Sequence, residues 1–205
     1  MNEENNNAAV NRGPVEHEVR DQIVNAATEH FSRYGYNKTT VSDLAKSIGF
    51  SKAYIYKFFP SKQAIGENIC TNCLNQIESE VQTVINEVNP PPEKLRRLFK
   101  EIVQASFRLF SQDRKLYEIA ASAAAEHWQA TIIYEQNIIA LLKGILVEGR
   151  ENGYFERKTP LDEVTIAIYH VLRPYLNPLM LEHNFNYIEE APTQLCNLVL
   201  RSLAP

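Results

Sequence analysis

Hydroxyl and lysine side chains recur between Thr39 and Lys62 at points where short helices can begin. Thr40, Ser51 and Ser61 each precede such a start by one residue, and three lysines lie nearby: Lys52, Lys57 and Lys62. A helix N-terminus presents unpaired backbone N–H groups and the positive end of a dipole, and both attract phosphate. These residues can therefore bind the phosphates of a nucleic-acid backbone.

Two short helices joined by a sharp turn would position these side chains. Apolar residues recur at the i, i+3, i+4 and i+7 positions of one helix face, namely Val41, Leu44, Ala45 and Ile48. Thr40 caps this helix, Asp43 completes a capping-box pair, and Gly49 ends the helix. Ser51 then caps a second helix over Lys52–Phe59, which a proline ends. Helices this close in sequence form a helix-turn-helix.

The same segment is basic within an acidic chain. Between His30 and Lys62 one acid, Asp43, stands against the basic residues Arg33, Lys38, Lys46, Lys52, Lys57 and Lys62, whereas the whole chain has a net charge of −4. We therefore expect a local attraction for DNA that weakens as salt rises. The plainer alternative is an ordinary helical hairpin whose lysines form a solvated face.

The string GYNKTTVSDLAKSIGFSKAYIYKFFPSK resembles the N-terminal domain of TetR-type transcriptional regulators, and the resemblance runs from about Arg20 to about Ile65. It includes the preceding helix, RDQIVNAATEHFSRYGY. The resemblance implies an all-α protein that binds a double-stranded DNA operator. Two residues depart from the family pattern. Tyr54 stands where Thr or Ser is usual, and Phe58 where His or Tyr is common.

The resemblance also implies roles for single residues. Thr40 and Lys62 resemble phosphate contacts, and Tyr56 resembles the tyrosine with which the family touches phosphate. The start of the recognition helix holds Lys52, Ala53 and Tyr54. With Ser51 and Lys57 these residues form the predicted DNA-binding set.

Composition and helix signals predict an all-α chain in three parts. Residues 1–14 are polar and read as a disordered arm, residues 15–62 as the helix-turn-helix domain, and residues 63–205 as a helical ligand-binding and dimerisation domain. The further helices are expected over 15–34, 61–88, 93–110, 114–128, 131–152, 161–172, 179–182 and 192–203. The Arg173-Pro174 and Asn177-Pro178 pairs are expected to interrupt or kink the chain.

Two functions of the body follow from the resemblance. The last two long helices would form a homodimer interface through Val164, Ile168, Val171, Leu172, Leu195, Leu198, Val199 and Leu203, although these residues could equally complete the monomer core. The middle helices would enclose an effector cavity, because small residues at 120–125 leave space beside bulky neighbours; the same small residues could instead let helices pack closely. The predicted ligand-binding residues are Phe107, Phe110, Tyr117, Glu118, Trp128, Tyr134 and Tyr169.

Several classes of function are not expected. Glycine-rich phosphate loops and hydrolase motifs are missing from the sequence, so we predict no enzyme, no cofactor and no metal site. Cys70 and Cys73 form a C-x-x-C string inside a helix, which favours packed thiols over a redox or zinc pair. Without a signal peptide or a run of about 18 apolar residues, we expect a cytoplasmic protein that does not bind membranes.

The sequence thus predicts a ligand-responsive repressor that binds a palindromic operator as a dimer. A small lipophilic effector would release it, and carboxylates at Glu118, Glu126 or Glu135 beside the aromatic rings would favour a cationic one. The regulated gene would encode an efflux transporter or a stress-response protein. The alternatives are a ligand-independent architectural DNA-binding protein and a transcriptional activator.

Overall fold

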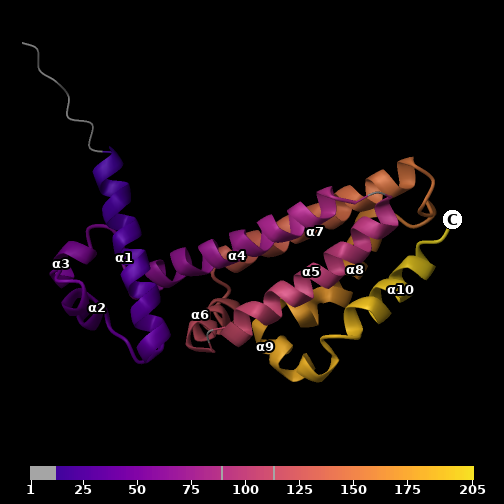
Figure 1. Ribbon diagram of the computed structural model, residues 1–205. Helices are drawn as coiled ribbons and strands as arrows, with labels where there is room; N and C mark the ends of the chain where they lie inside the picture. The colour runs from indigo at the N-terminus through magenta and orange to yellow at the C-terminus, as the bar shows by residue number, and fades with distance from the viewer. Residues whose placement is uncertain (1–12, 89, 113) are drawn as a thin grey trace, which may run out of the picture.

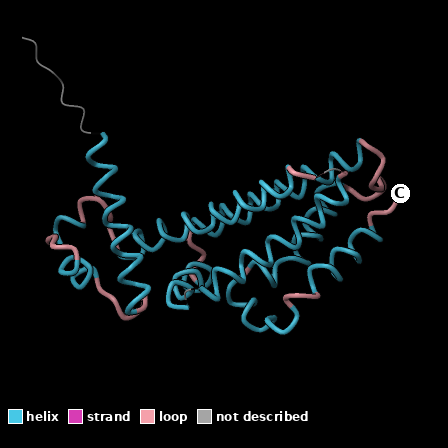
Figure 2. The backbone as a smooth tube through the Cα atoms, viewed as in Figure 1, coloured by secondary structure: helices cyan, strands magenta, loops and turns pink. Residues whose placement is uncertain are grey.

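The computed structural model describes residues 13–88, 90–112 and 114–205, and within these ranges it contains helices and no strand (Figure 2). The predicted all-α class is confirmed. The disordered arm predicted over residues 1–14 lies outside the described residues except for its last two, which begin the first helix. The helices are α1 (Gly13–Tyr34), α2 (Val41–Ser47), α3 (Lys52–Ile55), α4 (Lys62–Asn86), α5 (Pro91–Gln112), α6 (Arg114–Ala125), α7 (Gln129–Glu151), α8 (Leu161–Leu176), α9 (Pro178–Leu181), the 3₁₀ helix η1 (Glu182–Tyr187) and α10 (Ala191–Ser202).

Helices α1 to α3 and the start of α4 form a small head with its own core. Ile23 and Phe31 of α1 meet Leu44 of α2 and Ile55 of α3, and each is at most 1% exposed. Gly35 ends α1 in a left-handed conformation, φ +88°, which a residue without Cβ adopts at little cost. The head is therefore a folded unit that can hold α3 in a fixed position.

Helix α4 joins this head to the body (Figure 1). Its 25 residues span about 37 Å at 1.5 Å per residue. The first turns pack in the head through Ile65 and Ile69, whereas Ile77 and Val81 pack in the core of the body. One continuous helix thus belongs to both parts of the molecule.

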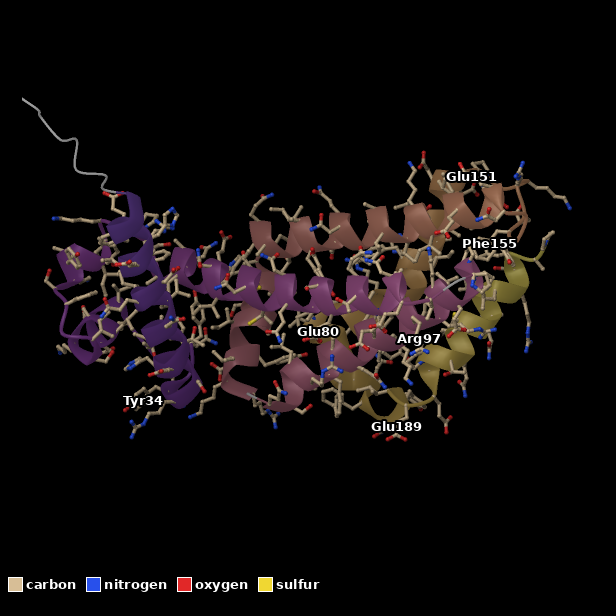
Figure 3. The ribbon with its side chains drawn as sticks, turned by 45° about the horizontal axis from the view of Figure 1, so that its top comes forward. Tyr34, Glu80, Arg97, Glu151, Phe155 and Glu189 are labelled. Atoms are coloured by element: carbon tan, nitrogen blue, oxygen red, sulfur yellow. The ribbon has the colours of Figure 1, made fainter. Side chains whose placement is uncertain are left out.

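The body packs α4, α5, α7, α8 and α10 around a second core. Leu98 and Ile102 of α5, Leu142 of α7 and Leu172 of α8 are fully buried there. Glu80, labelled on α4 in Figure 3, forms an ion pair with Arg108 of α5 at 2.6 Å. Arg108 also pairs with Glu101 of its own helix at 2.7 Å. The short helix α6 lies between this bundle and the head, in contact with α1, α4 and α9 (Figure 1).

The predicted end of α8 at Leu172 is wrong, because α8 continues through Pro174 to Leu176 and Arg173-Pro174 does not interrupt it. Pro174 lacks the N–H that would bond the carbonyl of residue 170, which ordinarily ends or kinks a helix. Leu172 and Tyr175 are 0% and 6% exposed on either side of it, so tertiary packing keeps this turn helical. Asn177 is where the chain turns, and its Oδ1 accepts a hydrogen bond from the Leu179 backbone at 2.9 Å.

Among the described helices, α7 alone is long and apolar enough, by length and composition, to cross a membrane. Its mean hydropathy over 18 residues reaches 1.4, although we expected no apolar run of about that length from the sequence. Ile138, Leu142 and Leu146 of α7 are at most 1% exposed and pack in the core of the body. The core helix of a folded domain has the same composition, so this composition alone does not indicate a membrane span.

Candidate nucleic-acid interface and ligand cavity

The three expected helix caps are present. Thr40 Oγ1 accepts from the Asp43 backbone N–H at 3.2 Å, Ser51 Oγ from Tyr54 N–H at 3.0 Å, and Ser61 Oγ from Ala64 N–H at 3.0 Å. These side chains fix where α2, α3 and α4 begin. The head therefore directs three successive helix starts outwards within about twenty residues of chain.

Thr40 and Asp43 hold each other more closely than a simple cap requires. The Thr40 hydroxyl donates to Asp43 Oδ2 at 2.6 Å, and the Thr40 backbone N–H donates to the same oxygen at 3.1 Å. The Thr40 hydroxyl, followed by its backbone N–H, lowers the pKa of Asp43, so the carboxylate is charged at neutral pH. A phosphate that contacts Thr40 has to displace this carboxylate, because both donors already have a partner.

The outer side of α3 and the turn after it carries four of the predicted DNA-binding residues. Lys52, Ala53, Tyr56 and Lys57 are exposed, whereas Ile55 on the inner side is fully buried. The Lys52 ammonium lies 5.7 Å from the centre of the Tyr56 ring. The helix itself is shorter than predicted, since α3 ends at Ile55 and residues 56–58 form a turn. This face presents positive charge and one exposed aromatic hydroxyl to solvent.

The two residues that depart from the family pattern contact each other. The Tyr54 ring lies between Phe50 and Phe58 in edge-to-face contacts, with centroid distances of 5.0 and 5.3 Å. Tyr54 is half-buried by these contacts, so its ring packs against the head. Tyr54 and Phe58 thus act as a pair that fixes the turns on both sides of α3.

Lys62 is held by the protein itself. Its Nζ donates to the carbonyls of Tyr36 and Thr39 at 3.1 and 3.2 Å and lies 4.3 Å from the centre of the Tyr36 ring. An ammonium has three N–H donors, so at most one is left for phosphate. Lys62 therefore ties the start of α4 to the loop before α2, a role that its sequence position did not reveal.

Arg20 was also not identified from the sequence. Its Nη1 donates to the Phe58 carbonyl at 2.8 Å, and its guanidinium lies 4.5 Å from the centre of the Phe59 ring. This contact fastens α1 to the turn after α3 across 38 positions of chain. No local spacing signal links residues so far apart.

The head meets the body at Trp128, which is 2% exposed. Its ring lies edge-on to Tyr36 at 5.8 Å, and a Cβ added to Gly66 of α4 would lie 3.0 Å from its Cη2. Its Nε1 donates to Glu126 at 2.8 Å. Trp128, predicted to bind ligand, thus lies at the head-body junction and outside the cavity described next.

A cavity of about 160 Å³ lies in the part of the body nearest the head. Helices α4 to α9 and the turn between α6 and α7 contribute to its walls, which contain Leu74, Ile77, Ser106, Leu109, Tyr117, Ala120, Ala124, His127, Tyr134, Glu135, Arg173, Leu176, Asn177 and Leu181, among others. The small residues of α6 do leave space, because Ala120 and Ala124 face this cavity. The walls are mostly apolar, as is usual for small-molecule sites.

Two residues of the predicted ligand set, Tyr117 and Tyr134, line the cavity. Phe107 is 38% exposed and packs on the Phe185 ring at 5.7 Å, and Glu118 lies beside Gly35 of the head. Tyr169 is buried outside the lining, and the side chain of Phe110 lies outside the described part of the structure. The structure thus brings together only part of that set.

The cavity also contains polar groups. The Tyr117 hydroxyl donates to the Pro178 carbonyl. The ring of Tyr134 lines the cavity, but its hydroxyl is fully buried and has no hydrogen-bond partner among the described residues. Burial raises the pKa of Tyr134, so this hydroxyl is neutral. His127, between α6 and α7, has φ +53°, and the Trp128 N–H bonds back to Ala123 at 2.9 Å. His127 thus occupies the left-handed position after a helix that glycine usually takes.

Cys70 and Cys73 carry free thiols on α4, and Cys70 reaches the cavity wall. Burial raises the pKa of Cys70 to about 12 and also raises that of Cys73, so both are protonated at neutral pH and weakly nucleophilic. Over the described ranges, no group of three or more His, Cys, Asp or Glu side chains could hold a metal ion.

A helix-turn-helix head with a basic recognition face, joined by one long helix to a body with a cavity, defines a DNA-binding transcriptional regulator. The chain belongs to the TetR family. The model of the tetR family of bacterial regulatory proteins matches residues 23–69, and that of the tetracyclin repressor-like C-terminal domain matches residues 91–199. The chain is accordingly a TetR-family transcriptional regulator, in a family of DNA-binding regulators and not of enzymes.

Similar proteins agree with this assignment. YhgD of Bacillus subtilis, an uncharacterized HTH-type transcriptional regulator, is 26% identical over 137 residues, which are 64% of this chain and 69% of YhgD. IcaR of Staphylococcus aureus, a negative transcriptional regulator of the biofilm operon icaADBC, is 31% identical over 85 residues, 42% of this chain and 46% of IcaR.

Solved structures share the fold. FadR of Bacillus halodurans, a fatty acid degradation regulator, has a TM-score of 0.65 at 24% identity over 88% of this chain and 94% of that one. FadR of Bacillus subtilis, solved in complex with stearoyl-CoA, has a TM-score of 0.65 at 21% identity over 89% of this chain and 98% of that one.

Proposed function

We propose that this chain represses transcription as a homodimer that binds a palindromic operator and that a small lipophilic effector releases from DNA. The observation that carries the DNA-binding part is the exposed face of Lys52, Ala53, Tyr56 and Lys57, beside capped helix starts, in an otherwise acidic chain. That face would enter the major groove, and Ser51 and Thr40 would approach the flanking phosphates. A protein with this role acts in the cytoplasm, where the DNA is.

Two observations support a dimer. A recognition helix as short as α3 makes few base contacts, and two copies related by a two-fold axis can bind two half-sites one helical turn apart. Helices α8 and α10 also expose Ile166 and Leu198, which are 40% and 62% exposed. Of the predicted interface stripe, Ile168, Leu172, Val199 and Leu203 instead complete the monomer core. The dimer contact we propose is therefore formed by the outward residues of these helices.

Release by ligand would use the turn between α6 and α7. His127 lines the cavity, and the next residue, Trp128, contacts Tyr36 of the head and lies against Gly66 of α4. Tyr36 in turn holds Lys62 at the start of α4. A ligand that favours a different position of this turn would move the head relative to the body and change the separation of the two recognition helices. Bound ligand would then lower the affinity for DNA, and bound DNA would lower the affinity for the ligand by the same factor.

The charges at the cavity argue against a strongly cationic effector. Of the three carboxylates considered from the sequence, only Glu135 lines the cavity, and Arg173 lines it too. We therefore propose a lipophilic effector without net charge. Control of an efflux or stress-response gene stays an expectation from the sequence.

The proposal is tested by selecting duplexes from a random pool with the purified protein and measuring its affinity for the enriched sequence. We predict enrichment of a palindrome and a loss of about tenfold in affinity for Lys52→Ala, consistent with one lost charge-assisted contact. Tyr56→Phe would lower affinity without dissociating the dimer. Lys158→Ala, which removes an exposed lysine of the body, is the matched control. Failure to enrich any sequence, or equal losses for Lys52→Ala and Lys158→Ala, would refute the assigned face.

A further inference from the structure

Cys70 and Cys73 are two thiols that the proposed function does not use. They lie three positions apart on α4, so they share one face of the helix, with about 5–6 Å between their Cβ atoms. Both thiols are free; Cys70 is 5% exposed and Cys73 is half-buried. Burial raises the pKa of Cys70 most, and Cys73 is close enough to raise it further. One atom can therefore bridge the two sulfurs.

Open space lies beside the two thiols. A small cavity of about 20 Å³ has both of them in its wall, among apolar side chains. It shares four lining residues with the larger cavity of the body, namely Cys70, Leu74, Leu109 and Ala120. The larger cavity extends to the surface, since Ile132 and Arg173 line it and both are exposed. Cys70 thus lies between the two cavities, where a molecule in the larger one can reach it.

The number of thiols limits which reagent they can hold. Zinc requires at least three protein ligands. Within residues 13–88, 90–112 and 114–205, no group of three or more His, Cys, Asp or Glu side chains is placed to supply them. Two thiols suit a soft electrophile that prefers sulfur and has two replaceable groups. A trivalent organoarsenical, R–As(OH)₂, meets this requirement because carbon already occupies the third position on arsenic.

The surroundings of the thiols favour an uncharged reagent. Burial raises the pKa of both Cys70 and Cys73, so both are protonated at neutral pH. A charged reagent would lose its hydration among the apolar walls, whereas an uncharged arsenical avoids most of this cost. Each hydroxyl on arsenic can also accept the thiol proton as it leaves. The reaction therefore does not require a thiolate to be present beforehand.

We propose that Cys70 and Cys73 form a binding site for an uncharged trivalent organoarsenical, whose carbon group lies in the larger cavity. In the reaction of R–As(OH)₂ with the two thiols, two As–S bonds form while two As–O bonds and two S–H bonds break. Each thiol proton leaves with one hydroxyl as water, arsenic stays trivalent, and neither sulfur is oxidised. The site requires neither DNA nor a dimer, so it stands or fails independently of the proposed function.

The test treats the full-length wild type with phenylarsine oxide, which hydrates to such an arsenical, in excess glutathione. Glutathione is a monothiol and removes arsenic that a single cysteine holds. We expect intact-protein mass spectrometry to show the gain of one phenylarsenic group, and thiol titration to show the loss of two of the three cysteine thiols. The dithiol 2,3-dimercaptopropanol should reverse both changes. No retained phenylarsenic group, or the loss of one thiol only, would overturn the inference.

Single substitutions distinguish the pair from a lone thiol. Cys73→Ser changes the half-buried member of the pair, so the fold should tolerate it. Cys196→Ala, which removes the thiol outside the pair, is the matched control. We expect Cys196→Ala to bind the probe like the wild type, and Cys73→Ser to bind it about a hundredfold more weakly, because its second As–S bond is no longer intramolecular. Equal affinity of Cys73→Ser and wild type would contradict a two-thiol site.

Urea unfolding shows whether the folded protein is the form that binds. An unfolded chain can also bring Cys70 and Cys73 together, but α4 holds them on one face beforehand. A probe that binds the folded state more tightly raises the urea concentration at the unfolding midpoint. We expect phenylarsine oxide to raise the midpoint of the wild type and not that of Cys73→Ser. An unchanged or lowered midpoint of the wild type would overturn the inference, since binding would not depend on the folded site.

Discussion

Lys62 shows why single residues of the head are hard to assign from sequence. Its position after Ser61 predicts a phosphate contact, but its Nζ bonds two carbonyls that lie 23 and 26 positions earlier in the chain. Arg20 bonds Phe58 over 38 positions. Local patterns do reveal Thr40 and Ser51 as caps, because a cap and its partner are only three residues apart. Partners that lie far apart in the sequence can be identified only from the three-dimensional structure.

Replacing Lys62 should therefore change stability as well as DNA affinity. We predict that Lys62→Ala lowers the free energy of unfolding by about 1–2 kcal/mol, because two charge-assisted hydrogen bonds and a cation–π contact are lost. Lys57→Ala, which removes an exposed lysine over the Tyr54 ring at 5.7 Å, should change it by less than about 0.5 kcal/mol. Urea unfolding of both variants measures the difference. If Lys62→Ala is as stable as the wild type, the contacts of Lys62 within the head do not stabilise the fold, and contact with DNA is its remaining role.

The raised pKa of Tyr36 leads us to predict that the folded protein loses stability in alkaline solution. Burial, with Glu126 and Glu67 nearby, raises the pKa of Tyr36 to about 12 from its ordinary value of 10. Since the folded state keeps the proton to higher pH than the unfolded state, this contribution is intact below pH 10 and is lost as pH rises towards 12.

We predict that wild type loses on the order of 2 kcal/mol more than Tyr36→Phe between pH 9 and pH 12. Denaturant unfolding across that range measures it, and the comparison cancels the cysteines and other tyrosines that titrate there. Parallel pH profiles for the two proteins would contradict the shift.

At the scale of elements, periodicity and caps predict where helices exist, and packing decides where several of them end. The α2 helix has its predicted cap at Thr40, and α4 begins as expected after Ser61. By contrast, α8 continues past Pro174, because buried side chains on both sides stabilise the turn. Helix α6 ends at Ala125, three residues early, where His127 takes a left-handed conformation. The α8 ending has a local signal, the Asn177-Pro178 pair, whereas the α6 ending was not predicted from the sequence.

Two glycines of α7 give a matched test of element packing. A Cβ at Gly149 would lie 2.0 Å from Cδ2 of Phe155, whereas a Cβ at Gly144 would meet nothing within 4 Å. We predict that Gly149→Ala destabilises the protein by about 1–3 kcal/mol by overpacking. Gly144→Ala should stabilise it by up to about 1 kcal/mol through helix propensity. Thermal unfolding distinguishes them, and equal melting temperatures would contradict the packing at the Phe155 turn.

At the scale of the molecule, the division into a DNA-binding head and a helical body could be predicted from the sequence. The side-chain contacts that join the head to the body could not. A basic head pattern, a long helix from Ser61 and a proline break near residue 90 predict two parts. The cavity was only partly predicted, since Tyr117 and Tyr134 line it while Trp128 supports the junction. Tyr36, Gly66 and Trp128 come from three distant segments, and no periodicity links them.

The central claim is that the head reads a specific DNA sequence through a basic face on an acidic protein. The most direct measurement is the affinity of the purified protein for the DNA upstream of its own gene across a salt series, with a random duplex as competitor. The account predicts tight binding that survives competition and falls steeply as salt rises, because phosphate contacts release counterions. Equally weak binding to the upstream duplex, the duplex enriched from a random pool and the random competitor would contradict sequence-specific reading by this head.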